Sequence, residues 1–170
     1  LFAYISVAGG VFVALFSEEI IQILTPSSYH KSIDVVTILS LLYASHFFGK
    51  QPQLIFAKKT GITSIMTLVS IFINIMINIP FIKFWGYLGA AYGSLISGII
   101  INVISFNVSQ RYFYIQWEKP KLFGMYSVLV LAIVSTIILR EIDLDYWIRL
   151  LVKIILGLTY ILMGFWCKFI

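Results

Sequence analysis

Long apolar segments separated by short polar turns fill the chain almost from end to end. Six such segments run over 1–24, 33–57, 62–84, 88–110, 122–139 and 146–169. A helix needs about 20 apolar residues to cross a bilayer, and most of the segments approach or exceed that length. Because every backbone amide in lipid needs a partner within the protein, we expect the segments to be α-helices. The pattern predicts an all-α membrane bundle of six transmembrane helices.

The composition excludes an ordinary soluble domain. The chain is 61% hydrophobic and 11% charged, with a mean hydropathy of +1.00, whereas soluble domains have about 25% charged residues. The net charge is +5, but the basic residues lie between the segments, so membrane orientation explains them better than nucleic-acid binding. The single cysteine, Cys167, cannot form an internal disulfide, and we find no Cys/His spacing typical of a metal site. We therefore expect no metal and no cofactor.

The distribution of positive charge predicts the orientation in the membrane. Seven Lys or Arg residues fall on the side that holds the loop near 58–59, the loop 111–121 and the C-terminus, against five on the other side. The positive-inside rule places the richer side in the cytoplasm. Arg149 and Lys153 oppose this bias, and we expect them to anchor to outer headgroups or to pair with Asp143 and Asp145. At the same side of the membrane, we expect one of Glu18 and Glu19 to be solvated and the other to cap or pair with the outer loops; the alternative is an ion-coupling carboxylate at the mouth of a cavity.

A polar stripe on the second segment supplies the first candidate site. Tyr43, His46, Lys50 and Gln53 follow one another at helical spacing and would share one face. A lysine inside a span costs about 2.5–3.5 kcal/mol, so Lys50 is a functional candidate that would line a water-filled cavity. The alternative is that Lys50 extends to the cytoplasmic headgroups. Pro52 is expected to kink this helix.

Two further stripes lie on the third and fourth segments. Asn74 and Asn78 either line the same cavity or form hydrogen bonds between helices, each contributing about 0.6 kcal/mol. Gly89, Gly93 and Ser97 recur at every fourth position, which predicts that this helix packs closely against a neighbour.

Catalytic patterns are missing from the sequence. We find no paired catalytic carboxylates, nucleophile elbow or phosphate loop, and the outer loop 140–145 is short for a membrane glycosyltransferase or polymerase. A polar-lined membrane bundle without such groups favours transport over catalysis, and we expect no enzymatic activity.

The order of several motifs resembles the C-terminal half of MATE-like polysaccharide and O-antigen flippases. The segment 85–94 (WGYLGAAYGS) is similar to the Gly-x-x-Gly-Ala-Ala helix start of that superfamily. The run 15–24, Tyr29, the turn Lys58-Lys59-Thr60, and Asn74 and Asn78 ahead of Pro80 follow the same order.

The resemblance implies a domain organisation. Residues 1–110 would form four helices of the C-terminal lobe of a 12–14-helix transporter, residues 111–121 a cytoplasmic loop, and residues 122–170 two additional helices. The chain begins at Leu1 inside an apolar segment, and we expect it to be part of a larger protein whose N-terminal lobe is its partner.

The resemblance also implies a function. Such a protein flips lipid-linked oligosaccharide, carried on undecaprenyl pyrophosphate, across the bacterial inner membrane by alternating access. A cationic residue suits the pyrophosphate, and Lys50 is the best-placed candidate. The alternative is a cation-coupled drug or metabolite antiporter of the same superfamily, which would carry acidic residues within the membrane.

Overall fold

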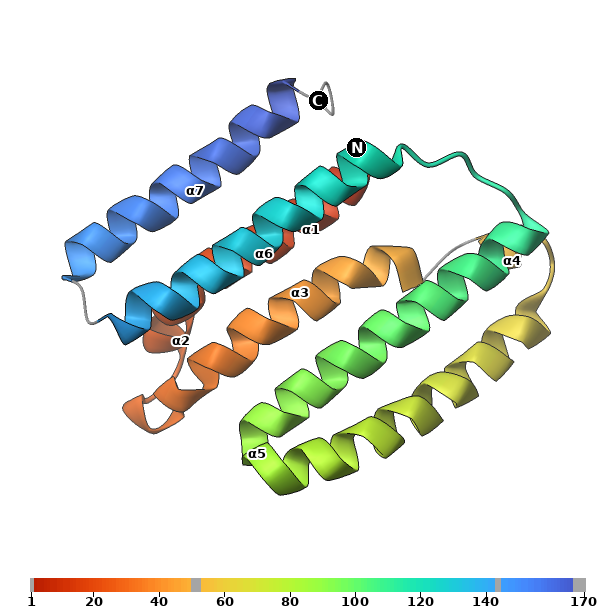
Figure 1. The fold of residues 1–170 in the computed structure, drawn as a ribbon, viewed down its shortest axis with the longest axis horizontal. Coiled ribbons are helices and arrows are strands. Elements are labelled where there is room, and N and C mark those ends of the chain that lie inside the picture. Colours follow the sequence, from red (N-terminus) through yellow and green to blue (C-terminus); the bar gives the residue numbers. More distant parts are fainter. Residues whose placement is uncertain (1, 50–52, 143–144, 167–170) are drawn as a thin grey trace. The chain divides into compact units, whose positions relative to one another are not determined.

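The structure is a computed structural model that describes residues 2–49, 53–142 and 145–166, and all regular elements within these ranges are helical (Figure 1). The elements are α1 (Phe2–Leu15), α2 (Ser17–Leu24), the 3₁₀ helix η1 (Ser27–Ser32), α3 (Ile33–Gly49), α4 (Gln53–Phe56), α5 (Thr60–Tyr112), α6 (Lys119–Glu141) and α7 (Tyr146–Trp166). The predicted all-α class is confirmed for the described part of the chain.

Two compact units divide the chain. We call residues 1–44 and 118–170 the terminal unit, because it joins the two ends of the sequence. We call residues 45–117 the hairpin unit. Each is described by itself.

In the terminal unit, α1 packs against α6 and α7, which also pack against each other. Val7, Ala14, Leu129 and Ala132 are almost fully buried between these helices. At one end, the rings of Tyr4 and Tyr160 stack at 4.9 Å, and each hydroxyl donates a hydrogen bond to the other residue's carbonyl, at 3.2 and 2.9 Å. Burial of these polar groups is tolerated because each hydroxyl has a partner.

A sharp bend separates α1 from α2. The two helices meet at Phe16 at an angle of 67°. Beside the bend, the hydroxyl oxygens of Ser17 and Thr37 lie 2.7 Å apart, which joins α2 to α3. Glu18 and Glu19 occupy the first turn of α2, where a negative charge is favoured by the helix dipole. The first apolar segment is therefore a broken helix rather than a straight one.

The hairpin unit is built on α5, which folds back on itself at Gly86 (Figure 1). Gly86 has φ 59° and ψ −133°, a backbone conformation that is essentially restricted to glycine. Beyond the bend, a Cβ atom on Gly89 would collide with the Phe81 carbonyl, and one on Gly93 would lie 2.5 Å from Asn78 Oδ1. The two arms of the hairpin thus approach closely because small residues face the first arm.

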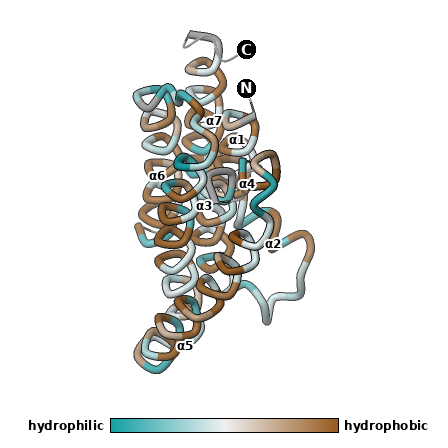
Figure 2. The backbone as a smooth tube through the Cα atoms, turned by 90° about the vertical axis from the view of Figure 1, so that its right-hand side faces the viewer, coloured by the Kyte–Doolittle hydropathy of each residue, from teal (hydrophilic) through white to brown (hydrophobic). Residues whose placement is uncertain are grey.

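Three helices of the described chain are long and apolar enough to cross a membrane, or four if the bent pair α1–α2 counts as one span. They are α5, most of α6 and most of α7. In the most apolar stretch of α5 no residue is buried, as expected for a helix that faces lipid. Figure 2 shows hydrophobic residues along the helices and hydrophilic residues mainly at turns and helix ends. The protein is a helical membrane protein.

One predicted helix falls partly outside the described residues. The segment 33–57 was expected to form a single kinked helix, and the structure describes it as helical on both sides of residues 50–52, with α3 up to Gly49 and α4 from Gln53. The predicted kink at Pro52 lies outside the described residues.

Candidate functional site

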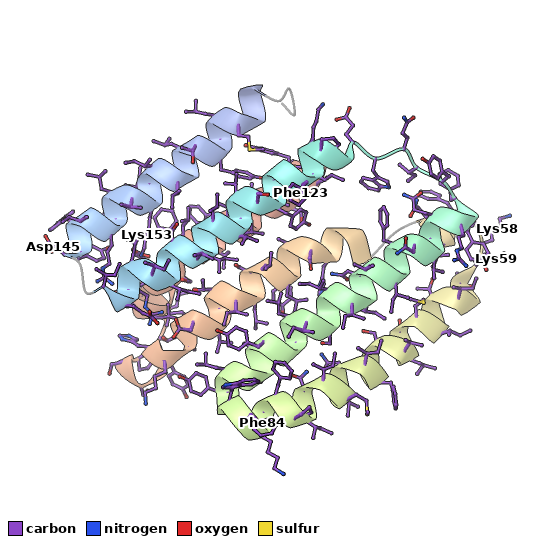
Figure 3. All side chains as sticks on the ribbon, in the orientation of Figure 1. Lys58, Lys59, Phe84, Phe123, Asp145 and Lys153 are labelled. Carbon is purple, nitrogen blue, oxygen red and sulfur yellow. The ribbon has the colours of Figure 1, made fainter. Side chains whose placement is uncertain are left out.

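Four charged side chains gather at the break between α1 and α2, and we call them the charge cluster: Glu18, Glu19, Arg149 and Lys153. The Lys153 ammonium on α7 lies 3.0 Å from Glu18 Oε2 and 2.7 Å from Glu19 Oε1. The Arg149 guanidinium, one turn earlier on α7, lies 3.2 Å from Glu18 Oε1. Figure 3 labels Lys153 on this helix. Two carboxylates and two cations therefore balance each other.

The charge cluster is withdrawn from solvent and lipid. The side chain of Lys153 is 1% exposed and that of Glu18 is 7% exposed. Lys153 lies inside the apolar span of α7, where an isolated charge would be costly. Removing charges from water is offset only when partners are close and well hydrogen-bonded. The pairing with Glu18 and Glu19 explains how a lysine can be buried there.

Two polar atoms of the charge cluster have no hydrogen-bond partner among the described residues. Within the described residues, Glu19 Oε2 and Arg149 Nε are buried without a hydrogen-bond partner. One is an acceptor and the other a donor, so the cluster could accept a further polar group or exchange partners. Arrangements of this kind, at a broken span, are typical of ion and substrate pathways in membrane proteins.

The sequence-based interpretation of Arg149 and Lys153 was wrong about their partners. Both were expected to reach outer headgroups or to pair with Asp143 and Asp145. The buried position of Lys153 excludes headgroup anchoring, and its carboxylate partners come from α2; Asp143 lies outside the described residues. The sequence did show that Glu18 and Glu19 interrupt one apolar segment and that Arg149 and Lys153 interrupt another. Nothing in the sequence indicated that these two sets of charges meet.

A second ion pair lies in the same unit. Arg140 near the end of α6 lies 2.6 Å from Asp34 in the first turn of α3, and both side chains are partly exposed. With the charge cluster, this pair links helices that are far apart in the sequence.

The structure describes three of the four residues of the stripe predicted on the second segment. Lys50 lies outside the described residues. Gln53 is fully buried and donates a hydrogen bond to the Phe113 carbonyl at 2.7 Å, so it supports the loop that follows α5. His46 is half-buried on α3, and Tyr43 is 65% exposed.

Tyr43 borders the cleft of the terminal unit, which measures about 420 Å³ between α1 and α3. Most of its lining is apolar or glycine: Gly9, Gly10, Val13, Val36, Leu39 and Ala44, with Ser6 and Ser40. Such a surface suits hydrocarbon better than sugar hydroxyls.

Asn74 and Asn78 lie between the arms of α5. Asn74 donates a hydrogen bond to Ser97 Oγ at 2.9 Å, and Asn78 donates to Asn74 Oδ1 at 2.9 Å. Asn78 also reaches Ser94 Oγ at 3.4 Å. These contacts correspond to the hydrogen-bonding alternative, because the amides connect the arms. Gly89, Gly93 and Ser97 are buried on the same contact face of the second arm.

No protein-family model matches the chain, and neither a curated protein nor a solved structure matches it. The described residues also contain no group of three or more His, Cys, Asp or Glu side chains that could hold a metal ion. The candidate site that the structure describes is a balanced, largely buried set of charges at a break in a membrane helix.

Proposed function

We propose that the chain belongs to the C-terminal lobe of a transporter that exports lipid-linked oligosaccharide across the bacterial inner membrane by alternating access. The observation that carries the transport proposal is the charge cluster at the broken helix α1–α2. The substrate class rests on the resemblance of residues 85–94 and the neighbouring motifs to polysaccharide flippases.

The broken helix supports transport for a physical reason. Polar and ionisable residues within membrane spans are costly, and they are typical of pathways and moving helices. Broken helices occur in transporters, where they supply backbone groups to a site near the middle of the membrane. Here the break at Phe16 and the buried Lys153 combine both features.

In the proposed topology the chain crosses the membrane six times. The spans are α1–α2, α3–α4, each arm of α5, α6 and α7. As one straight helix, α5 would be about 80 Å long, far more than the bilayer core of about 30 Å, so one span for each arm is the physically reasonable assignment. The excess of Lys and Arg then places the C-terminus in the cytoplasm.

The proposed substrate requires two chemically different surfaces. Cationic groups, with Lys50 as the first candidate, would meet the pyrophosphate, and the apolar cleft beside Tyr43 suits hydrocarbon. The N-terminal lobe of the same protein would complete the cavity. We propose no bond chemistry for the chain and no catalytic residue.

Deletion of the gene for the whole protein tests this function. Surface polysaccharide should be lost, and lipid-linked oligosaccharide should accumulate at the cytoplasmic face of the inner membrane. Complementation with Lys50→Ala should fail at normal protein abundance, and Lys50→Arg should restore much of the export. Unchanged surface polysaccharide in the deletion strain would refute the flippase proposal.

A cation-coupled antiporter of the same superfamily is the second candidate, because Glu18 and Glu19 are acidic residues inside a broken span. Both carboxylates already contact cations, which favours the first proposal. Increased drug sensitivity of the deletion strain, with normal surface polysaccharide, would favour the antiporter.

A further inference from the structure

The charges of the hairpin unit are all of one sign. Residues 45–117 contain five basic residues and no Asp or Glu. The basic residues are Lys50, Lys58, Lys59, Lys83 and Arg111. Since the whole chain has a net charge of +5, the hairpin unit accounts for all of it, and its cations cannot be neutralised by carboxylates of their own unit.

Three of these cations meet at one end of the hairpin. Its bend is at Gly86, and its arms begin at Thr60 and end at Tyr112, so they have equal length and their free ends lie together. Lys58 and Lys59 precede the first arm, and Arg111 is in the last turn of the second. Figure 3 shows Lys58 and Lys59 at this end and Phe84 at the bend. We call Lys58, Lys59 and Arg111, which are all exposed, the basic end.

The basic end has an ordered framework. Gln53 of α4 donates to the Phe113 carbonyl at 2.7 Å. Gln110 holds the same loop twice, since its Nε2 donates to the Ile115 carbonyl at 3.1 Å and its Oε1 accepts from the Ile115 amide at 2.9 Å. These buried or half-buried glutamines fold the chain after α5 back onto the helix.

This framework exposes aromatic side chains beside the cations. Tyr112 is 46% exposed, Phe113 49% and Tyr114 78%, and Phe56 on α4 is 73% exposed. Tyrosine is enriched at the headgroup level of membranes because its ring is apolar and its hydroxyl is polar. A combination of cations and exposed aromatics at the end of a membrane hairpin fits the boundary between hydrocarbon and headgroups.

The backbone at Lys58 provides an independent observation. Lys58 has φ 54°, a left-handed conformation that is costly for most residues other than glycine and asparagine. The amides of Lys58 and Lys59 donate to the carbonyls of Ile55 and Leu54, at 2.9 and 2.8 Å, and close the end of α4. Glycine is the usual residue at such a helix end, so a lysine at this position carries backbone strain that a glycine would avoid.

We propose that the basic end binds the headgroups of anionic phospholipids. The hairpin unit has no Asp or Glu of its own, and the phosphates of an anionic lipid surface would supply the counter-charge that this unit lacks. The inference depends only on the chain lying in a membrane, and it holds whatever the chain transports.

Native mass spectrometry of the full chain, purified in a neutral detergent, tests the proposal. The protein is titrated with phosphatidylglycerol or with phosphatidylcholine of identical acyl chains, and the fraction carrying bound lipid is measured. Wild-type protein should prefer phosphatidylglycerol. Each Lys or Arg near an anionic surface strengthens association about fivefold, so the loss of three in Lys58→Gln/Lys59→Gln/Arg111→Gln should lower the preference by about 100-fold.

Two matched variants separate binding from folding. Lys83→Gln removes the same charge from the same unit at the opposite end, and it should retain the preference. Lys58→Asn removes one charge but tolerates the left-handed backbone, so it should fold normally and lose about fivefold in preference.

Four results would overturn the proposal. Three are an undiminished preference in the triple variant, an equal loss in Lys83→Gln, and displacement of the lipid by an equal concentration of inorganic phosphate, which would indicate a small-anion site. The fourth is equal binding of both lipids by the wild type.

Discussion

The two units of the chain bury polar groups in different ways. The terminal unit uses ions: Lys153 contacts Glu18 and Glu19, and these residues are more than 130 positions apart in the sequence. The hairpin unit uses neutral groups: Asn74 and Ser97 form an amide–hydroxyl contact between arms that are joined by one bend. A neutral hydrogen bond contributes little to the free energy of unfolding, and breaking it leaves only uncharged groups without a partner. Breaking a buried ion pair leaves an uncompensated charge, which costs more. We therefore expect the stability of the terminal unit to depend on a few charged residues, and the stability of the hairpin unit to depend on the close packing of its two arms.

The largest effect should follow Lys153→Met. This change leaves Glu18 and Glu19 buried with Arg149 as the only remaining cation of the charge cluster, and breaking a buried pair in this way costs about 3–5 kcal/mol. The free energy of unfolding in mixed micelles of neutral detergent and dodecyl sulfate measures it.

A rescue and a control keep that result interpretable. Adding Glu19→Gln to Lys153→Met should recover most of the loss, because a neutral amide costs less to bury and the remaining Glu18 and Arg149 still balance each other. Lys31→Met, at an exposed position of the same unit, should change little. A tolerated Lys153→Met would mean that the charge cluster does not stabilise the fold.

Gly93→Leu should have the next largest effect. A Cβ atom added at this position would lie 2.5 Å from Asn78 Oδ1 and 3.2 Å from Asn78 Cα. The larger side chain must therefore separate the arms, at a cost of about 1–3 kcal/mol. The measurement is the abundance of folded protein in the membrane.

Gly61→Leu is the matched control for Gly93→Leu. Gly61 lies in the same helix, and a Cβ atom there would meet nothing within 4 Å. Equal loss of folded protein in both variants would show that a larger side chain on α5 is harmful wherever it lies, and that close approach of the arms does not determine the effect.

The contact between Asn74 and Ser97 should contribute less. A double-mutant cycle with Asn74→Ala and Ser97→Ala is expected to give a coupling energy of about 0.6 kcal/mol, the average for hydrogen bonds between membrane helices. A coupling above about 2 kcal/mol would exceed the largest values of that class and would make the two units alike in their dependence on single contacts.

The smallest effect is expected for an ion pair in the terminal unit. Lys121 contacts Glu118 at 2.6 Å, but the two side chains are 39% and 68% exposed. Exposed pairs of this kind contribute about 0.3–0.5 kcal/mol, so Lys121→Gln should barely change the unfolding free energy. A large loss of unfolding free energy would show that the terminal unit depends on its ion pairs whether or not they are buried.

The part of the structure that could be predicted from the sequence is local. Apolar length predicted the all-helical class, and the turn Trp85-Gly86-Tyr87 separated two segments that the structure joins as a hairpin. The recurrence of Gly89 and Gly93 predicted close packing of this helix, and the structure places both glycines against the first arm. Such features need only the spacing of residues along one helix.

The charge cluster could not be predicted for a physical reason. Helical spacing puts Arg149 and Lys153 on one face of α7, but it does not say which helix faces them. The choice of Glu18 and Glu19 depends on the packing of α1 against α7 and on the bend at Phe16. Gln53 shows the same limit, because its hydrogen bond to the Phe113 carbonyl joins positions 60 residues apart in the sequence.

The bend at Gly86 has a consequence for changes in chain length. The contacting pairs Asn78–Ser94, Asn74–Ser97 and Phe81–Gly89 have their midpoints within one residue of Gly86, so the arms are paired as mirror images. One residue inserted in an arm, between Asn74 and Ser97, would rotate everything beyond it by about 100°. The facing glycines and asparagines would then lose their register together. Related sequences should therefore tolerate insertions near the ends of the arms and keep the length of 74–97 constant.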